Sequence, residues 1–299
     1  MRPRRRCPGS GSAASSKARD LAEAGAPEYG VGVTVGPVGP FASGNADVRR
    51  IHHVGIVVRR LETAYGFYRD VLGLPLVKEQ TVAEQGVRAA LFGAGETEIE
   101  LLEPLGETTP VGRFLTRRGE GLHHLCFETP DVSVALTALK DRGVELIDTA
   151  PRRGLAGQIA FLHPRACAGV LVECATPPAG EPDASPSPLR FKRLVIGASD
   201  VAGAAGSFQT LFGLGEVAMN GGPRTMLAVG SGTLLFVPAQ EVGGTEGMVA
   251  LSFVAEDFLA LTASLCRAGT QRLDGTGEVT VEPAGSHGVH LHISRYMFP

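Results

Sequence analysis

The sequence contains no tryptophan, and aromatic residues make up only 6% of it. Charge is nearly balanced, with 28 Lys and Arg against 31 Asp and Glu, and basic residues are not interleaved with aromatics as in a nucleic-acid groove. No apolar run approaches the roughly 20 residues of a membrane span, and the N-terminus lacks the apolar centre of a secretory signal. We therefore expect a cytoplasmic protein that acts on a small molecule, without nucleic-acid or membrane partners.

Cysteine is also scarce. The five residues, Cys7, Cys126, Cys167, Cys174 and Cys266, form no C-x-x-C pair, which argues against a disulfide framework and against a cysteine zinc site. Two of them fall within apolar strand-like runs, where a cysteine usually behaves as a small hydrophobe. We predict five reduced thiols.

Two segments lack the hydrophobic period of a folded element. Residues 1–48 begin with arginines and continue in Gly, Ala, Ser and Pro, so we expect a disordered leader. Such a start also fits a transit peptide to the mitochondrial matrix, although Asp20, Glu23 and Glu28 weaken that interpretation. Residues 177–188 read PPAGEPDASPSP and have the Pro density of an extended linker. The predicted folded domains are therefore 49–176 and 189–299.

The first folded segment shows one order of elements twice. Strand-like runs and helical spacing predict a strand, a helix and three strands at 51–58, 61–72, 74–79, 87–92 and 98–102, and again at 122–128, 132–141, 144–147, 158–162 and 170–174. The half after the linker begins the same order, since FKRLVIGASDVAGAAGSFQTLFGLG aligns with IHHVGIVVRRLETAYGFYRDVLGLP. We predict an α+β fold of paired βαβββ modules in two tandem domains.

Four polar residues interrupt apolar strands of the first domain: His53, Glu100, His124 and Glu173. Charged side chains seldom lie buried in strands without a partner, which raises the question of what these four surround. Two imidazoles and two carboxylates suit a divalent ion such as cobalt, manganese, nickel or zinc, and sequence does not choose among these. Side-chain alternation assigns the neighbouring His52 and His123 to the other face of their strands.

The segments HHVGIVV, FYRDVLGL, EQGV, ELLEP, TTPVGRFL, RGEGLHHLCFE and GQIAFLHPRACAGVLVE follow one another in this chain. In this order, residues 49–178 resemble the methylmalonyl-CoA epimerase family of the vicinal oxygen chelate superfamily. The resemblance implies the vicinal oxygen chelate fold, and one divalent metal ion held by His53, Glu100, His124 and Glu173.

The implied reaction interconverts (2R)- and (2S)-methylmalonyl-CoA by 1,1-proton transfer through a metal-stabilised enolate. Glu173 is then both a ligand and a candidate base. Some family members place a second glutamate where this chain has Ala89, so Glu128, or else Glu98, becomes the candidate for the second base. We assign His163 and Arg165 to contacts with the acyl-CoA substrate.

Rival functions use the same scaffold. A glyoxalase-type lyase has a similar ligand set, and an epimerase or isomerase redirected to a secondary-metabolite sugar or cyclitol is a further alternative. A ring-cleaving dioxygenase uses two histidines and one glutamate, so Glu100 argues against it. A metal-free binding protein of the superfamily would lack the four ligands.

The second domain departs from this pattern. Alignment replaces His53 by Arg193, Glu100 by about Leu234, His124 by Ala250 and Glu173 by about His292. We predict a degenerate, metal-free copy, which makes the protein either an internal pseudo-dimer or a homodimer.

Overall fold

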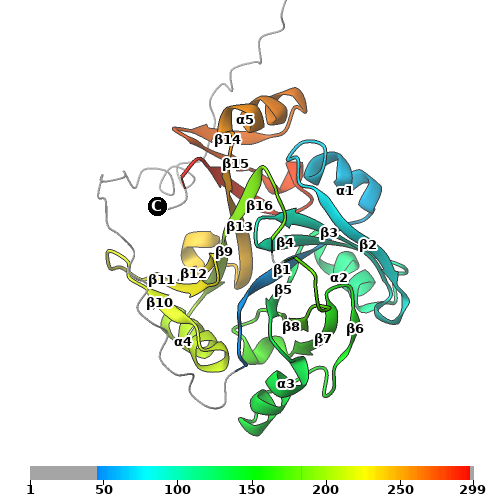
Figure 1. Cartoon of the computed structure of the whole chain (residues 1–299). Coiled ribbons are helices and arrows are strands. Elements are labelled where there is room, and N and C mark those ends of the chain that lie inside the picture. Colours follow the sequence, from blue (N-terminus) through cyan, green and yellow to red (C-terminus); the bar gives the residue numbers. More distant parts are fainter. Residues whose placement is uncertain (1–45, 183, 297–299) are drawn as a thin grey trace, which may run out of the picture.

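The computed structural model describes residues 46–182 and 184–296, so the predicted leader lies almost wholly outside the described residues. Two eight-stranded mixed sheets form the molecule, each with helices packed on it (Figure 1). The strand order is β2-β3-β4-β1-β5-β8-β7-β6 in the first sheet and β10-β11-β12-β9-β13-β16-β15-β14 in the second. Adding eight to each label of the first order gives the second, which confirms the paired modules and the two tandem domains.

The first sheet and its helices comprise β1 (Arg50–Val57), α1 (Leu61–Tyr68), β2 (Leu76–Val82), β3 (Val87–Ala94), β4 (Thr97–Pro104), α2 (Pro110–Arg118), β5 (Gly121–Glu128), α3 (Val132–Asp141), β6 (Arg152–Gly154), β7 (Gly157–Leu162) and β8 (Val172–Thr176). The second comprises β9 (Leu189–Ala198), α4 (Val201–Phe212), β10 (Gly215–Val217), β11 (Thr225–Val229), β12 (Gly232–Pro238), β13 (Gly247–Ala255), α5 (Phe258–Arg267), β14 (Arg272–Gly275), β15 (Glu278–Val281) and β16 (His290–Ser294). Three helices begin at an aspartate cap, Asp131, Asp200 and Asp257, whose carboxylates accept backbone N–H groups of the first turn.

Two expectations about elements were wrong or incomplete. The predicted strand at 144–147 is absent, because this segment makes a single bridge, Leu146 to Leu162, and the edge strand beside β7 is β6. The apolar character of 144–147 comes from packing against the core rather than from strand pairing. Helix α2 was not predicted; its Thr109 cap and Pro110 at the first helical position are ordinary signals of a helix start.

Each sheet has two faces with different roles. One face of both sheets contributes to a single hydrophobic core that contains, for example, Ile51 and Val54 of β1 and Phe191 and Leu194 of β9. We call this the core face. The other face of the first sheet carries His53 and the residues around it, and we call the corresponding face of each sheet the ligand face.

The two domains contact each other reciprocally. Helix α1 reaches the second domain, where the Tyr68 hydroxyl donates to the Ser286 carbonyl at 3.0 Å. The corresponding helix α4 packs on the first domain through Phe208, whose ring centroid is 6.4 Å from that of Phe127. The turns before β8 and β16 each hold one non-glycine residue in the left-handed region, Ala168 and His287. Each domain therefore packs its first helix against the other domain.

Three cysteines, Cys126, Cys167 and Cys174, are free and buried, as predicted. Cys266 on α5 is disulfide-bonded, so the prediction of reduced thiols was wrong there. The absence of C-x-x-C spacing excludes only local pairs.

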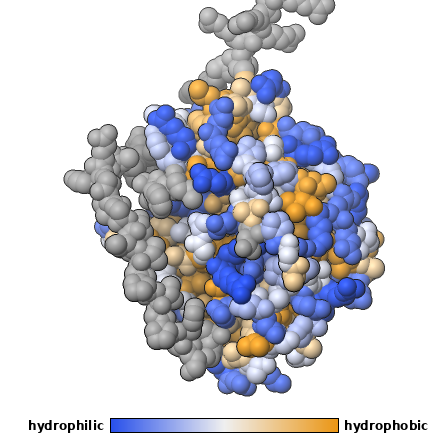
Figure 2. Space-filling model, in the orientation of Figure 1, coloured by the Kyte–Doolittle hydropathy of each residue, from blue (hydrophilic) through white to orange (hydrophobic). Residues whose placement is uncertain are grey.

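The surface drawn in Figure 2 mixes hydrophilic and hydrophobic residues. Exposed large apolar side chains are spread over several elements, as with Leu259 on α5 and Val134 on α3. Within the described residues, no helix has the length and apolar character needed to cross a membrane.

Candidate metal site and active site

Strand β1 lies at the centre of the first sheet, parallel to β4 and antiparallel to β5. The strand registers place Glu100 of β4 and His124 of β5 on either side of Gly55. His53 pairs with Cys126 of β5. Glu173 of β8 is in turn the neighbour of Cys126. All four predicted ligands therefore come from the middle of one sheet and lie on its ligand face.

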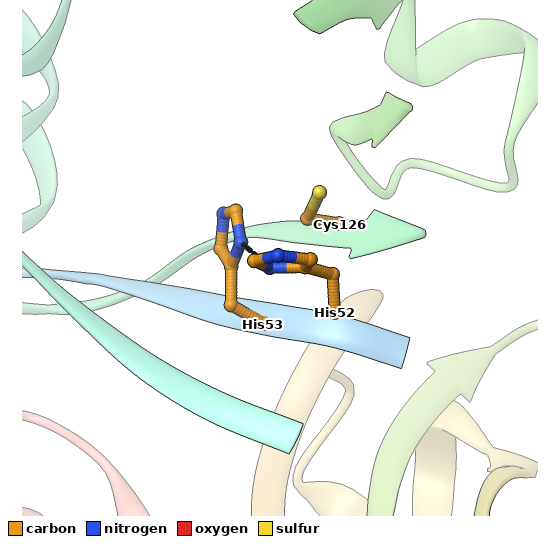
Figure 3. Close-up of side chains that lie close together, drawn as sticks. All are labelled: His52, His53 and Cys126. Atoms are coloured by element: carbon orange, nitrogen blue, oxygen red, sulfur yellow. Dashed lines mark hydrogen bonds between the residues drawn. The ribbon is translucent and has the colours of Figure 1, made fainter. Parts of the chain in front are cut away.

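Two β-bulges change the pattern around the histidines. Register shifts between β1 and β5 leave His52 as an extra residue of β1 and His123 as an extra residue of β5. Figure 3 shows that His52 projects to the same side of the sheet as His53 and Cys126. The prediction that His52 lies on the opposite face was therefore wrong, because simple alternation does not hold across a bulge. His123 likewise turns its ring to that of His124.

The two predicted ligand histidines, His53 and His124, point their Nε2 atoms at each other, 2.9 Å apart. Oε2 of Glu100 lies 3.5 Å from Nε2 of His53 and 3.3 Å from Nε2 of His124. The carboxylate of Glu173 stands 3.9 Å and 3.7 Å from the same two nitrogens. Four donor groups thus converge from β1, β4, β5 and β8.

These separations fit a metal ion. Ligands at bonds of about 2.1 Å are about 3.0 Å apart at right angles and about 3.4 Å apart at tetrahedral angles. All four side chains are buried, with 1–6% of their surface exposed. Among the described residues, no lysine or arginine forms an ion pair with either carboxylate. Two facing imidazole lone pairs and two buried carboxylates need a proton or a cation between them. The ligand atoms of His53, His124 and Glu173 all lie within 4.8 Å of one another and could hold a divalent ion, with Glu100 beside both histidines.

The outer nitrogens of the ligand histidines have partners. Nδ1 of His53 lies 2.9 Å from Nδ1 of His52, and Nδ1 of His124 lies 3.1 Å from Nδ1 of His123. Burial lowers the pKa of His52 and of His123 to about 3, so both are neutral. We assign the Nδ1 protons to His53 and His124, which then donate to their neighbours and leave Nε2 free as a ligand.

The protonation of the cluster follows from its burial and charges. Burial raises the pKa of Glu173 to about 7, and the charge of Glu100 adds to this effect. Burial also lowers the pKa of His53 well below its usual value. Burial works against a charged His124, but a hydrogen bond to Glu100 and the charge of Glu173 raise its pKa. Without a metal, the cluster therefore retains protons near neutral pH.

Gly55 makes room for the His124 ring. A Cβ at this position would stand 2.9 Å from Nε2 of His124 and closer still to its Cε1 and Nδ1 atoms, nearer than real Cβ atoms approach. The glycine at the position facing the second histidine is therefore part of the site, and sequence analysis did not identify it.

Three further side chains surround the cluster. The thiol of Cys126 lies 3.5 Å from Oε1 of Glu173. The ring of Phe161 packs edge-on against His124, with centroids 5.5 Å apart, and the guanidinium of Arg152 lies 5.3 Å from the Phe161 centroid. Arg152 is also one of the groups whose charge acts on Glu173.

Other predicted site residues lie outside the cluster. Glu128 is buried, but Oε2 accepts from Nε of Arg50 at 2.7 Å. Nδ1 of His163 accepts from the backbone N–H of Arg165, and the Arg165 side chain is 74% exposed and paired with Glu145 at 2.6 Å. Both residues occupy the turn after β7.

The two residues that bear on the second base differ in environment. Ala89, at the position where some family members have a glutamate, is buried in an apolar cluster with Val57 and Leu102. Glu98 lies on β4 beside His53, and its Oε2 atom is buried without a hydrogen-bond partner among the described residues. Burial raises the pKa of Glu98 to about 7.

Comparison with known proteins identifies the family. The model of the glyoxalase/bleomycin resistance protein/dioxygenase superfamily matches residues 52–161. The uncharacterized protein YqjC of Bacillus subtilis (strain 168) is 46% identical over 131 residues, which are 44% of this chain and 94% of that protein. Mitochondrial methylmalonyl-CoA epimerase of Mus musculus is 39% identical over 126 residues, 42% of this chain and 71% of the mouse protein. The chain belongs to the methylmalonyl-CoA epimerase family of this superfamily.

One solved structure similar to part of this chain is a Streptomyces coelicolor methylmalonyl-CoA epimerase in complex with 2-nitronate-propionyl-CoA. It is 38% identical, with a TM-score of 0.44, and the match covers 44% of this chain and all of that one. Family membership, which rests on the sequence relatives, confirms the prediction of an isomerase of the epimerase type. Each of these matches covers less than half of the chain.

Proposed function

We propose that the first domain interconverts (2R)- and (2S)-methylmalonyl-CoA in a metal-dependent reaction. The observation that carries the proposal is the convergence of His53, Glu100, His124 and Glu173 on one buried point of the ligand face. A carbon acid beside a thioester carbonyl loses its proton slowly because negative charge develops on the carbonyl oxygen. A buried cation site next to proton-transfer groups answers this requirement.

The four residues would hold cobalt, manganese, nickel or zinc, all compatible with two nitrogen and two oxygen donors. A bound ion supplies Lewis-acid stabilisation of the developing charge, on the order of several kcal/mol. His52 and His123 fix the tautomer and orientation of the two ligand histidines through their Nδ1 contacts. Phe161 covers the edge of His124 and limits the access of water to that side.

Proton transfer needs one group on each side of the substrate α-carbon. One carboxylate takes the proton as the C–H bond breaks, and another acid returns a proton to the opposite side, each step worth roughly 10²- to 10⁴-fold. We assign Glu173 to one side. For the other, Glu98 is supported by its buried Oε2 atom, which has no hydrogen-bond partner among the described residues and lies 3.7 Å from Nδ1 of His52. The Arg50 ion pair of Glu128 favours a structural role for that residue.

Substrate contacts are proposed for three basic side chains. Arg152 stacks on Phe161 near the metal cluster and provides positive charge for the substrate carboxylate. His163 and Arg165 follow β7, and Arg165 is exposed enough to meet the phosphates of coenzyme A. Arg152→Met should raise KM more than Arg165→Met, since Arg152, held by Asp148 at 3.1 Å, lies against Phe161 beside the cluster, whereas Arg165 is exposed.

Loss of the α-hydrogen signal of methylmalonyl-CoA in D₂O, followed by proton NMR, tests the proposal. The metal-loaded protein should exchange this hydrogen well above the spontaneous rate, and chelation or His124→Ala should abolish the excess. Metal-loaded protein without exchange would reject this substrate.

A second substrate class has one observation in its favour. The apolar surroundings of Ala89 leave no acid at a position where some family members have one. An epimerase or isomerase acting on another oxygen-chelating substrate, such as a sugar or cyclitol, would need a different second acid. Proton exchange from such a substrate, without exchange from methylmalonyl-CoA, would favour this alternative.

We further propose that the two domains form an internal pseudo-dimer, so that the chain is a monomer of about 31.2 kDa. We also propose a cytoplasmic location. The reciprocal packing of α1 and α4 supports the internal pair. Light scattering at a mass of two chains would contradict it.

A further inference from the structure

The second domain keeps the strand register of the site but carries cationic side chains in place of its two neutral histidines. Arg193 pairs with Thr233 and Ser252 as His53 pairs with Glu98 and Cys126, so Arg193 occupies the position of His53. The bulge between β9 and β13 leaves Lys192 as the extra residue, the position of His52. Two neutral imidazoles of the first domain are therefore replaced by two cationic side chains.

Two of the three remaining ligand positions, Leu235 and Ala250, cannot bind a metal. Val195 corresponds to Gly55 and pairs with Ala250, which corresponds to His124, so a valine occupies the room that the imidazole needs. Val195 also pairs with Leu235 of β12, which makes Leu235 the counterpart of Glu100; the alignment with Leu234 was off by one residue. His292 is the counterpart of Glu173, as predicted, and its Nε2 lies 3.1 Å from Glu278.

These replacements leave an apolar surface beside the two cations. Val195 is two residues along β9 from Arg193 and therefore on the same face, about 7 Å away. It packs with Met226, Leu235 and Val237 in a small cluster of their own, separate from the main core. Val195 and Ala250 are half-buried, whereas Gly55 and His124 of the first domain are buried. The ligand face of the second domain is thus less closed at these positions than that of the first.

Arg193 lacks the partner that a buried cation requires. Its Nε atom is buried without a hydrogen bond among the described residues. Burial lowers the pKa of Arg193, and burial together with the charge of Arg193 lowers the pKa of Lys192 to about 8. Lys192 has a partner, since its Nζ donates to the Tyr296 carbonyl at 3.1 Å. The nearby carboxylate of Glu278 lies 3.1 Å from Nε2 of His292. A half-buried guanidinium with an unpaired, buried Nε beside a second cation is unfavourable unless an anion joins them.

We propose that the ligand face of the second domain is a metal-free binding site for a small organic carboxylate. The carboxylate pairs with the guanidinium of Arg193, within the positive field of Lys192. Its short apolar body covers Val195 and Leu235. An arginine donates through planar N–H groups that match a carboxylate, and the adjoining apolar cluster selects against a bare inorganic anion. This site is independent of the reaction proposed for the first domain.

Isothermal titration of the full-length, chelator-treated protein with butyrate, methylmalonate and inorganic phosphate tests the proposal. We expect one saturable site for the carboxylates, at least tenfold weaker in Arg193→Met and unchanged in Arg190→Met, which alters an exposed arginine of the same strand. His124→Ala should leave this binding unchanged, which separates the site from the first domain. Phosphate binding as tight as butyrate binding would overturn the role of the apolar cluster.

Thermal unfolding separates a binding role from a structural one. Because Arg193 has no partner for Nε, Arg193→Met should keep or raise the midpoint of the ligand-free protein and lose the upward shift that butyrate causes in the wild type. A midpoint lowered by several degrees with unchanged carboxylate binding would assign Arg193 to structure and reject the site. Absence of carboxylate binding to the wild-type protein would reject it as well.

Discussion

Gly55 and Val195 occupy corresponding positions in the two domains, and substitution of Gly55 tests how the metal site is built. In Gly55→Ala, the new methyl carbon would lie 2.9 Å from Nε2 of His124, and closer to Cε1 and Nδ1. Carbon contacts are comfortable from about 3.5 Å, so the nearest ring atoms must retreat by more than about 1 Å. The ring is not free to do so, because Nδ1 is held by His123 and the ring edge packs on Phe161.

We expect two consequences of Gly55→Ala. Overpacking of the sheet should lower the free energy of unfolding by roughly 1–3 kcal/mol. Displacement of a metal ligand by about 1 Å should lower catalytic efficiency by roughly 100-fold, together with a loss of metal affinity. Urea denaturation, metal analysis and proton exchange measure the three effects. Gly66→Ala is a matched control, because a Cβ on this exposed helical glycine meets nothing within 4 Å.

The double variant Gly55→Val, His124→Ala reproduces the pair Val195 and Ala250 of the second domain. The double variant should lose less unfolding free energy than the two single variants added together, by a coupling energy of roughly 0.5–3 kcal/mol. Metal binding should stay lost. Full activity of Gly55→Ala, or strictly additive stabilities, would refute the steric account of this position.

Three further predictions concern charged groups of the first domain. Arg50→Ala leaves the buried Glu128 with only the exposed Arg49, at 3.7 Å, and should cost about 3 kcal/mol of unfolding free energy in urea. A cost below about 1 kcal/mol would contradict the assigned ion pair. Glu98→Gln should reduce kcat by roughly 10²- to 10⁴-fold with little change in stability, whereas Glu128→Gln should mainly reduce stability; the reverse result would make Glu128 the base. Because the pKa of Glu173 is raised from 4.5 to about 7, its contribution to the stability of the metal-free protein is complete below pH 4.5 and is lost as the pH rises through about 7. The buried neutral histidines His52 and His123, with pKa values lowered to about 3, titrate below pH 6.5. The midpoint of thermal unfolding of the chelator-treated protein should therefore fall between pH 6.5 and about pH 8, while the stabilisation by added metal grows. A metal-free midpoint that rises across this range would contradict the raised pKa of Glu173.

Much of the fold could be predicted because its signals are local and repeated. Helix and strand periodicity, together with the repeat, identified the two modules of each domain. The strand predicted at 144–147 failed because apolar residues that pack on a core have the same composition as a short strand. The edge strand β6 was missed because Arg152–Gly154 has no apolar alternation to mark it.

The candidate ligands could be predicted because polar residues inside apolar strands are conspicuous. Side-chain alternation along a strand does not predict β-bulges. The two bulges bring His52 and His123 to the ligand face and give each ligand histidine its partner. A register shift depends on pairing between strands distant in the chain, and one strand alone does not record it. The same limit produced the one-residue error at Leu235.

The most direct test of the central claim is a titration of metal-free, full-length protein with Co²⁺ while α-proton exchange of methylmalonyl-CoA is followed in D₂O. A single site in the first domain predicts that exchange rises from the spontaneous rate and saturates at one ion per chain. Exchange that is already complete without metal, or that saturates only at two ions per chain, would contradict the account.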